Sequence, residues 1–307
     1  MKKLPLVFIA VFGLLFAFVS GCFKEDAPEQ TNSTAVASSE DIAAPVVSDD
    51  SAAKEQMQLG NKYYNGDGLP KDLEKAAACF TKAAELGLPE AQFTLALRYL
   101  KGEGVPVDDK KAAAWLEKAA SQGYADAALR LGTMYESGQG VPKNKEQALF
   151  CYTKAAKDGN VAAAAILGDA FYNGEITTQD YAKAAHWYEV AAKQGNARAE
   201  FMLGEMYNEG QGVDKDYAKA ANWYGKAAQQ RYAEAQIKLA MLYESGRGVP
   251  QNYAMAYMWL SLACEAFNPD LQSQAQMMLK TIKWENPEVV DNGEALLKNW
   301  IKQNTGK

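Results

Sequence analysis

Residues 131–159 read LGTMYESGQGVPKNKEQALFCYTKAAKDG, and the architecture follows from this stretch. It contains four glycines, one proline and a pair of adjacent alanines, and closely similar stretches return at steps of 36 residues. Four columns keep one residue type or a close substitute in all six copies: Gly at 66 to 246, Ala at 76 to 256, Asp or Asn at 72 to 252, and Tyr or Phe at 63 to 243. A fixed period of 20 to 50 residues without strand-like alternation is typical of a solenoid.

Each copy predicts two helices. Asn144 stands where an N-cap residue would accept free backbone N–H groups, and apolar residues follow it at helical spacing. Gly159 ends this second helix, helix B, as a left-handed C-cap residue. The first helix, helix A, ends at Gly138, and Pro142 prevents it from continuing. Because each pair needs a neighbour to cover its apolar face, the sequence predicts an all-α solenoid of six 36-residue helix–turn–helix repeats.

Some positions depart from an ideal repeat. Gly132, Gly168 and Gly204 lie inside helix A, where Gly destabilises a helix by about 0.5 to 1 kcal/mol relative to Ala. We expect an aromatic side chain of a helix B to pack over them. Ile176 stands where the second turn glycine belongs, so either this turn differs or Ile176 is strained. Arg231 replaces a helix-ending glycine, at a cost near 1 kcal/mol if the left-handed angle is kept.

The repeated unit resembles the Sel-1-like repeat, a relative of the tetratricopeptide repeat. Its pattern is A-x-x-x-L-G-x-x-Y-x-x-G-x-G-V-x-x-D-x-x-K-A-x-x-W-Y-x-K-A-A-x-x-G. Residues 198–228 satisfy it almost fully, and the resemblance covers residues 53–266. It implies a right-handed α-solenoid whose inner wall binds a partner. After it the pattern ends, and two amphipathic stretches follow. We expect residues 267–307 to form capping helices that hide the last open face.

The N-terminus predicts export and lipidation. An apolar run of 16 residues is shorter than the roughly 20 that a bilayer span needs, so residues 1–21 are interpreted as a signal peptide, with a short membrane anchor as the alternative. The run ends in Val19-Ser20-Gly21-Cys22, which resembles the lipobox of bacterial lipoproteins. The resemblance implies cleavage before Cys22 and its acylation, which would hold the protein on a membrane. Phe23, in place of Asp, implies sorting to the outer membrane of a Gram-negative envelope, facing the periplasm.

Residues 22–52 predict a disordered tether. From residue 23 to 52, seven acidic residues accompany one lysine, and Phe23 is the only aromatic residue. Such a segment cannot bury enough apolar surface to offset its ordering entropy. The whole chain has a net charge of -6, and the tether accounts for most of it. The remaining body is close to neutral, which argues against a nucleic-acid partner.

The sequence predicts no catalytic residue, metal, cofactor or small-molecule substrate. The single histidine, His186, lies outside the apolar stripe of its helix, and no spacing supplies three or four metal ligands. Cys79 and Cys151 are two repeats apart, about 20 Å if helix layers stack at about 10 Å, which is too far for a disulfide. Together with Cys264, they are expected to be small buried residues. The lysine column of residues 75, 111, 183 and 219 is expected to be a solvated face.

The alternative function is a cell-wall enzyme of β-lactamase or hydrolase type, since some Sel-1-like proteins are described as β-lactamases. Ser51-Ala52-Ala53-Lys54 fits the S-x-x-K motif, and Lys280-Thr281-Ile282 is the nearest match to K-T-G. Enzymes of that class need these groups to converge in one pocket. A third possibility is a surface-exposed factor that binds host proteins.

The favoured function is a membrane-anchored scaffold that binds a partner protein or peptide of the cell envelope. Because the repeated columns fill the core, binding must come from helix A columns that vary between copies. These columns lie at spacing i, i+3 and i+7. The candidates are Thr94, Leu97, Lys101; Arg130, Thr133, Ser137; Ile166, Asp169, Asn173; Met202, Glu205, Glu209; and Lys238, Met241, Ser245.

Overall fold

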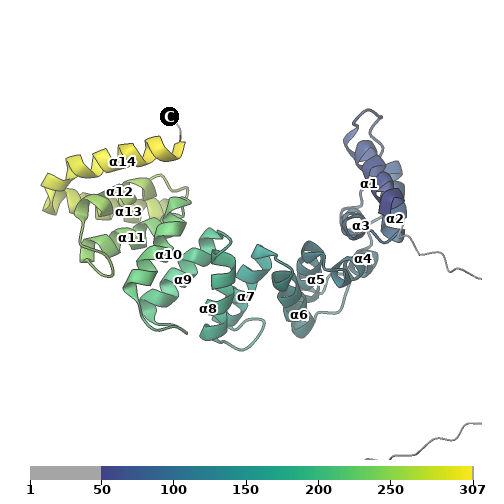
Figure 1. Ribbon diagram of the computed structural model, residues 1–307, viewed down its shortest axis with the longest axis horizontal. Helices are drawn as coiled ribbons and strands as arrows, with labels where there is room; N and C mark the ends of the chain where they lie inside the picture. Colours follow the sequence, from purple (N-terminus) through teal and green to yellow (C-terminus); the bar gives the residue numbers. More distant parts are fainter. Residues whose placement is uncertain (1–49, 306–307) are drawn as a thin grey trace, which may run out of the picture. The chain divides into compact units, whose positions relative to one another are not determined.

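The structure is a computed structural model, and it describes residues 50–305. Within this range it contains fourteen α-helices, one 3-10 helix (Pro287–Val289) and no β-strand. The helices follow one another in chain order (Figure 1), and twelve of them form six A–B pairs. The A helices are α1 (Asp50–Asn65), α3 (Pro89–Lys101), α5 (Ala125–Ser137), α7 (Val161–Asn173), α9 (Ala197–Glu209) and α11 (Ala233–Ser245). The B helices are α2 (Leu73–Glu85), α4 (Asp109–Ser121), α6 (Lys145–Lys157), α8 (Tyr181–Ala192), α10 (Tyr217–Gln229) and α12 (Tyr253–Ala263). The predicted all-α solenoid is confirmed.

Packing is local, as a solenoid requires. Each A helix contacts its own B helix, and each B helix contacts the next A helix. Repeated alanines such as Ala112, Ala127 and Ala148 are completely buried, and their small side chains let the helices approach closely. The buried residues form successive clusters along the helices, so each repeat depends on its neighbours for a covered apolar face.

The first helix begins at Asp50, three residues before the predicted start of the repeats at residue 53. Asp50 lies in the first turn, where a negative charge is favourable, and it pairs with Lys54 at 2.6 Å. The predicted signal peptide, the lipid site at Cys22 and the tether up to residue 49 lie outside the described residues. Among residues 50–305, no helix is both long enough and apolar enough to cross a bilayer.

The N-caps of the B helices follow the prediction. Asn144 accepts the backbone N–H of Gln147, and Asp72, Asp108, Asp180 and Asp216 each accept that of the lysine three residues later. These backbone hydrogen bonds are the main reason that the pKa of all four Asp carboxyls is lowered. The lysine column is exposed, as predicted, and each ammonium also lies 5.2 to 5.6 Å from the ring centre of an aromatic residue at the end of helix A.

The prediction about the glycines inside helix A is confirmed. A β-carbon added at Gly204 would lie 2.6 Å from Cδ1 of Tyr224, twenty residues later on helix B. Gly132 with Tyr152 and Gly168 with Tyr188 show the same arrangement, and so does Gly60 with Phe80 in the first repeat. In the two repeats that have Ala in this position, 96 and 240, the residue twenty positions later is Leu, at 116 and 260. Residue size in helix A is therefore matched to residue size in helix B.

The second turn glycine allows the turn to contact the preceding B helix. A β-carbon at Gly140 would lie 2.5 Å from the carbonyl carbon of Asp109 and would overlap its oxygen. Among the described residues Arg231 is the only non-glycine residue with a positive φ, so Ile176 is not in the left-handed region. The turn of the fourth repeat therefore differs, and Ile176 packs against the core without that strain.

Arg231 keeps the left-handed angle that its position requires, with φ 63°. Its guanidinium lies 3.6 Å from the Glu265 carboxylate and 5.8 Å from the ring centre of Trp300 in α14 (Val290–Thr305). Phe267 lies 36 residues after Arg231 but does not have this angle. The preceding helix, α12, ends at Ala263, two residues before the position that corresponds to the end of α10.

We expect Arg231→Gly to leave stability nearly unchanged and Arg231→Ala to destabilise the protein by about 1 kcal/mol relative to Gly. Both variants lose the exposed ion pair and the cation–π contact, but only Gly relieves the backbone strain of about 1 kcal/mol. Urea unfolding of the two variants measures the difference. Equal midpoints and slopes for Gly and Ala would contradict the left-handed angle.

The C-terminal helices cover the last repeat. α13 (Pro269–Glu285) packs on α12, and so does α14, whose Gly293 lies against the ring of Tyr257. The rings of Trp300 and Trp259 meet edge to face, with centres 6.2 Å apart. Both helices thus contribute apolar side chains to the core cluster that contains α12.

Candidate partner-binding surface

The predicted binding positions lie on one repeated face of the A helices, which we call the helix-A face. None of them is buried in the structure. The last position of each set is exposed, at residues 101, 137, 173, 209 and 245. The first two positions, 94 and 97, and most of their counterparts in the other repeats are half-buried. The columns that vary between repeats therefore reach the surface, while the shared columns fill the core.

Two of the predicted residues are already engaged in hydrogen bonds within the fold. Asp169 accepts a hydrogen bond from the buried Tyr188 hydroxyl and pairs with Arg198 of the next A helix. Glu205 accepts from the buried Tyr224 hydroxyl and pairs with Lys238, again on the next A helix, at 2.9 Å. Burial, and then the bonded carboxylate, raise the pKa of both tyrosines far above the usual range. Asp169 and Glu205 hold repeats together as well as lying on the surface.

The third repeat arranges these groups differently. The Tyr152 hydroxyl donates to Glu136 instead of residue 133, which is Thr. Arg130 is equivalent to Lys238, but the residue equivalent to Glu205 in the preceding repeat is Leu97. Within residues 50–305, no ion pair of Arg130 is found, and its Nε is buried without a hydrogen-bond partner. Arg130 is thus a cation on the helix-A face without a neighbouring carboxylate in this column. The column has Leu97 here, and Asp169 and Glu205 in later repeats.

A cavity of about 610 Å³ opens on the helix-A face between α9 and α11. It brings together four predicted side chains: Glu209, Lys238, Met241 and Ser245. The other lining residues are Asn208, Tyr224, Leu242, Glu244, Arg247 and Tyr253. Asn208 and Glu244 share a column that also varies between repeats, so the sequence contained a signal for them. The remaining predicted residues lie along the A helices and not around this cavity.

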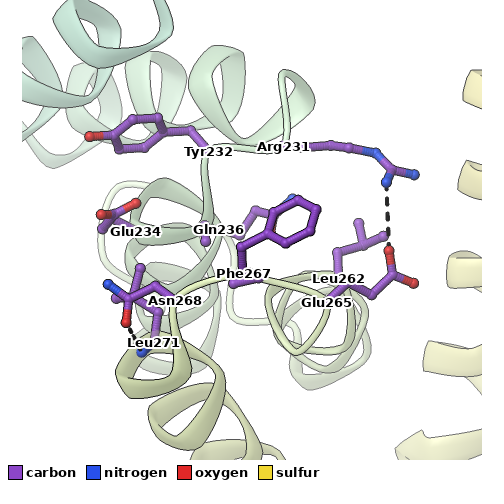
Figure 2. A pocket seen from close by; sticks show the side chains of 11 residues that line it. Arg231, Tyr232, Glu234, Gln236, Leu262, Glu265, Phe267, Asn268 and Leu271 are labelled. Atoms are coloured by element: carbon purple, nitrogen blue, oxygen red, sulfur yellow. Dashed lines mark hydrogen bonds and ion pairs between the residues drawn. The ribbon is translucent and has the colours of Figure 1, made fainter.

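A second hollow, of about 300 Å³, lies between the loop that joins α10 to α11 and the loop that joins α12 to α13 (Figure 2). Several of its polar side chains already have partners: Arg231 pairs with Glu265, Gln236 donates to the Ala228 carbonyl at 3.2 Å, and Asn268 caps α13. Its most exposed apolar residue is Phe267. The candidate site therefore stays on the helix-A face, where unpaired charges and the larger cavity occur.

The groups considered for enzyme chemistry do not converge. Ser51 and Lys54 lie on α1 and bond to Glu55 and Asp50, while Lys280 and Thr281 lie on α13. In the described part of the chain, no cluster of His, Cys, Asp and Glu could hold a metal ion.

The three cysteines outside the predicted lipid site are free thiols. Cys79 and Cys151 are buried, as expected, whereas Cys264 is half-buried. Desolvation raises the pKa of the Cys151 thiol to about 11 and keeps it un-ionised at neutral pH.

Comparison with known proteins gives the same architecture. The chain is similar to the crystal structure of c5321, a protective antigen present in uropathogenic Escherichia coli strains and displaying an SLR fold, with 36% identity and a TM-score of 0.70. That match covers 84% of this chain and 54% of c5321, so the chain spans about half the length of that relative. A Sel1 repeat protein from Oxalobacter formigenes is also 36% identical, with a TM-score of 0.62 and coverage of 74% and 66%. The search of functionally curated proteins found no match.

The Sel1 repeat model matches six consecutive segments, with boundaries close to those of the six helix pairs. They are residues 56–88, 89–124, 125–160, 161–196, 197–232 and 233–266. Together they cover more than half of the sequence. This chain therefore belongs to the Sel1 repeat family.

Proposed function

We propose that this protein is a membrane-anchored scaffold of the bacterial cell envelope that binds a partner protein or peptide on the helix-A face. Sel1 repeat proteins are generally protein-interaction scaffolds and are typically not enzymes. The observation that carries the proposal is the cavity between α9 and α11, since the residues that vary between repeats surround it. The lipobox-like sequence before Cys22 supports the membrane anchor.

The buried network beneath this face supports binding. Tyr224 lines the cavity, and its hydroxyl is fixed by Glu205, which Lys238 also holds. A surface whose side chains are already held in place loses less conformational entropy when a partner binds. The helix-A face is therefore suited to recognition with little rearrangement.

We expect Ser245→Trp to abolish capture of the partner. Ser245 is exposed at the cavity, and an indole there would obstruct part of it. The matched control is Asn222→Trp, which adds the same bulk at an exposed position of helix B. After crosslinking in intact envelopes, the full chain and Asn222→Trp should capture the same partner, and Ser245→Trp at least tenfold less. Equal capture by both Trp variants would refute the assignment of the face.

A separate test addresses the anchor. We expect Cys22→Ser to prevent incorporation of labelled palmitate and to move the protein from the membrane to the soluble fraction, because the thioether needs the cysteine sulfur. Cys264→Ser is the control, since this half-buried thiol lies in the folded repeats. Labelling that persists in Cys22→Ser would show that the anchor lies elsewhere.

A further inference from the structure

The helix-A face continues beyond the sixth repeat, onto α13. The Gln272 side chain donates to the Cys264 carbonyl at 2.9 Å, just as Gln92 donates to Ala84 and Gln236 to Ala228, each eight residues earlier. Asn268 caps α13 at the position at which Asn160 and Asn196 cap α7 and α9. α13 therefore begins as the A helix of a seventh unit, and it contacts α11, the A helix before it.

The 36-residue step extends the binding columns onto this helix. Met277 is equivalent to Met241, and both are exposed, at 71% and 43% of their surface. Trp284 lies seven residues after Met277, on the same side of α13, and is 87% exposed. Large apolar side chains with this exposure are uncommon among the described residues. We call Met241, Met277 and Trp284 the Met–Trp patch.

No other part of the described chain covers this side of α13. In the six repeats a B helix packs on its own A helix, but α14 lies over α12 (Figure 1). There Gly293 meets the ring of Tyr257. Thr281 and Lys280, on the same side as Met277, are also exposed. The Met–Trp patch is thus the open, apolar end of the helix-A face.

The charges beside the patch indicate what fits there. The cavity next to Met241 is lined by Glu209 and Glu244, neither of which has an ion pair in the described chain. Two cations line the same cavity: Lys238 pairs with Glu205, and Arg247 has no ion pair in the described chain and lies 5.7 Å from the ring centre of Tyr217. Glu209 already accepts a hydrogen bond from the Asn208 amide at 2.6 Å. With Glu205 counted, three carboxylates stand beside two cations here, and this excess of negative charge favours an added cation.

We propose that the Met–Trp patch anchors an amphipathic segment of the partner, with large apolar or aromatic side chains on the patch and a Lys or Arg side chain facing Glu209 and Glu244. The inference rests on the proposed function and specifies its partner. Methionine adapts to irregular apolar surfaces, and exposed tryptophan often dominates binding energy in interfaces. A helix or turn with anchors at i, i+3 or i+4, and i+7 matches such a face.

The test is selection of random 16-residue peptides on the full chain with Cys22→Ser. We expect enriched peptides to share two or more large apolar residues at helical spacing and a Lys or Arg. Met277→Ser with Trp284→Ser should weaken these peptides at least tenfold, while Phe150→Ser, which removes an exposed aromatic from helix B, should not. Glu209→Lys with Glu244→Lys should change the preferred charge to acidic. Circular dichroism melting checks that the variants fold.

Several outcomes would overturn the inference. These are no enriched peptide, enriched peptides that bind the Met277/Trp284 variant equally well, or a photo-crosslinker at residue 277 that joins only lipid or a second copy. If Ser245→Trp stops partner capture while the Met277/Trp284 variant does not, the scaffold function stands and only the patch assignment fails. If neither change affects capture, the proposed function itself fails.

Discussion

Gly140→Ala should destabilise the protein by about 3 kcal/mol or more. Two effects combine at this residue. Its φ of 69° is unfavourable for any residue with a β-carbon, at about 1 to 2 kcal/mol. In addition, the new methyl group would overlap the backbone of Asp109 at the start of α4, and backbone cannot move aside as a flexible side chain can.

The matched control is Gly123→Ala. Gly123 has a φ of 84°, but nothing lies within 4 Å of an added β-carbon. It should therefore show only the conformational effect of about 1 to 2 kcal/mol. Urea unfolding followed by circular dichroism measures both variants. If the two variants have the same stability, the turn does not contact the preceding helix as closely as described.

Gly204→Ala should destabilise by about 1 to 3 kcal/mol, although Ala is the better helix former. The β-carbon would lie 2.6 Å from two ring carbons of Tyr224, and such overpacking outweighs a propensity gain of about 0.5 to 1 kcal/mol. Gly225→Ala, in a helix position with nothing within 4 Å, should show the propensity gain alone. The two substitutions differ only in what surrounds the new methyl group.

A second substitution tests the size matching. Tyr224→Leu alone should destabilise, because it leaves a cavity over Gly204 and removes the hydroxyl that Glu205 binds. Gly204→Ala with Tyr224→Leu recreates the Ala–Leu combination found at residues 96 and 116. Its loss of stability should be smaller than the sum of the two single losses by 1 kcal/mol or more. Strict additivity would show that the two positions do not contact each other.

The periodic sequence was sufficient to predict the fold. The 36-residue step placed the helices, and the cost of Gly204 inside a helix correctly predicted an aromatic side chain over it. Whether Arg231 keeps the left-handed angle of the glycine that it replaces was left open by the pattern, and the structure shows that it does. These predictions worked because each depends on local backbone geometry or on contacts between adjacent repeats.

The binding surface was harder to predict, since variation between repeats has more than one cause. Asp169 and Glu205 each bind a buried tyrosine hydroxyl, whereas Tyr152 in the third repeat binds Glu136 and leaves Thr133 in this column. A buried tyrosine hydroxyl needs a partner, so this role could have been inferred from Tyr188 and Tyr224. Met277 was one further step of 36 away, but the repeat pattern fades at Phe267 and concealed it.

The ion pairs between consecutive A helices make the contacts between some repeats sensitive to salt. Among the described residues they occur only from α7 to α11, at Asp169–Arg198 and Glu205–Lys238. Between α3 and α5, Leu97 stands where the acid would be. Salt screens partly exposed charges but does not weaken apolar packing. We therefore expect rising ionic strength to weaken the contacts between α7, α9 and α11 and to leave those between α3 and α5 unchanged.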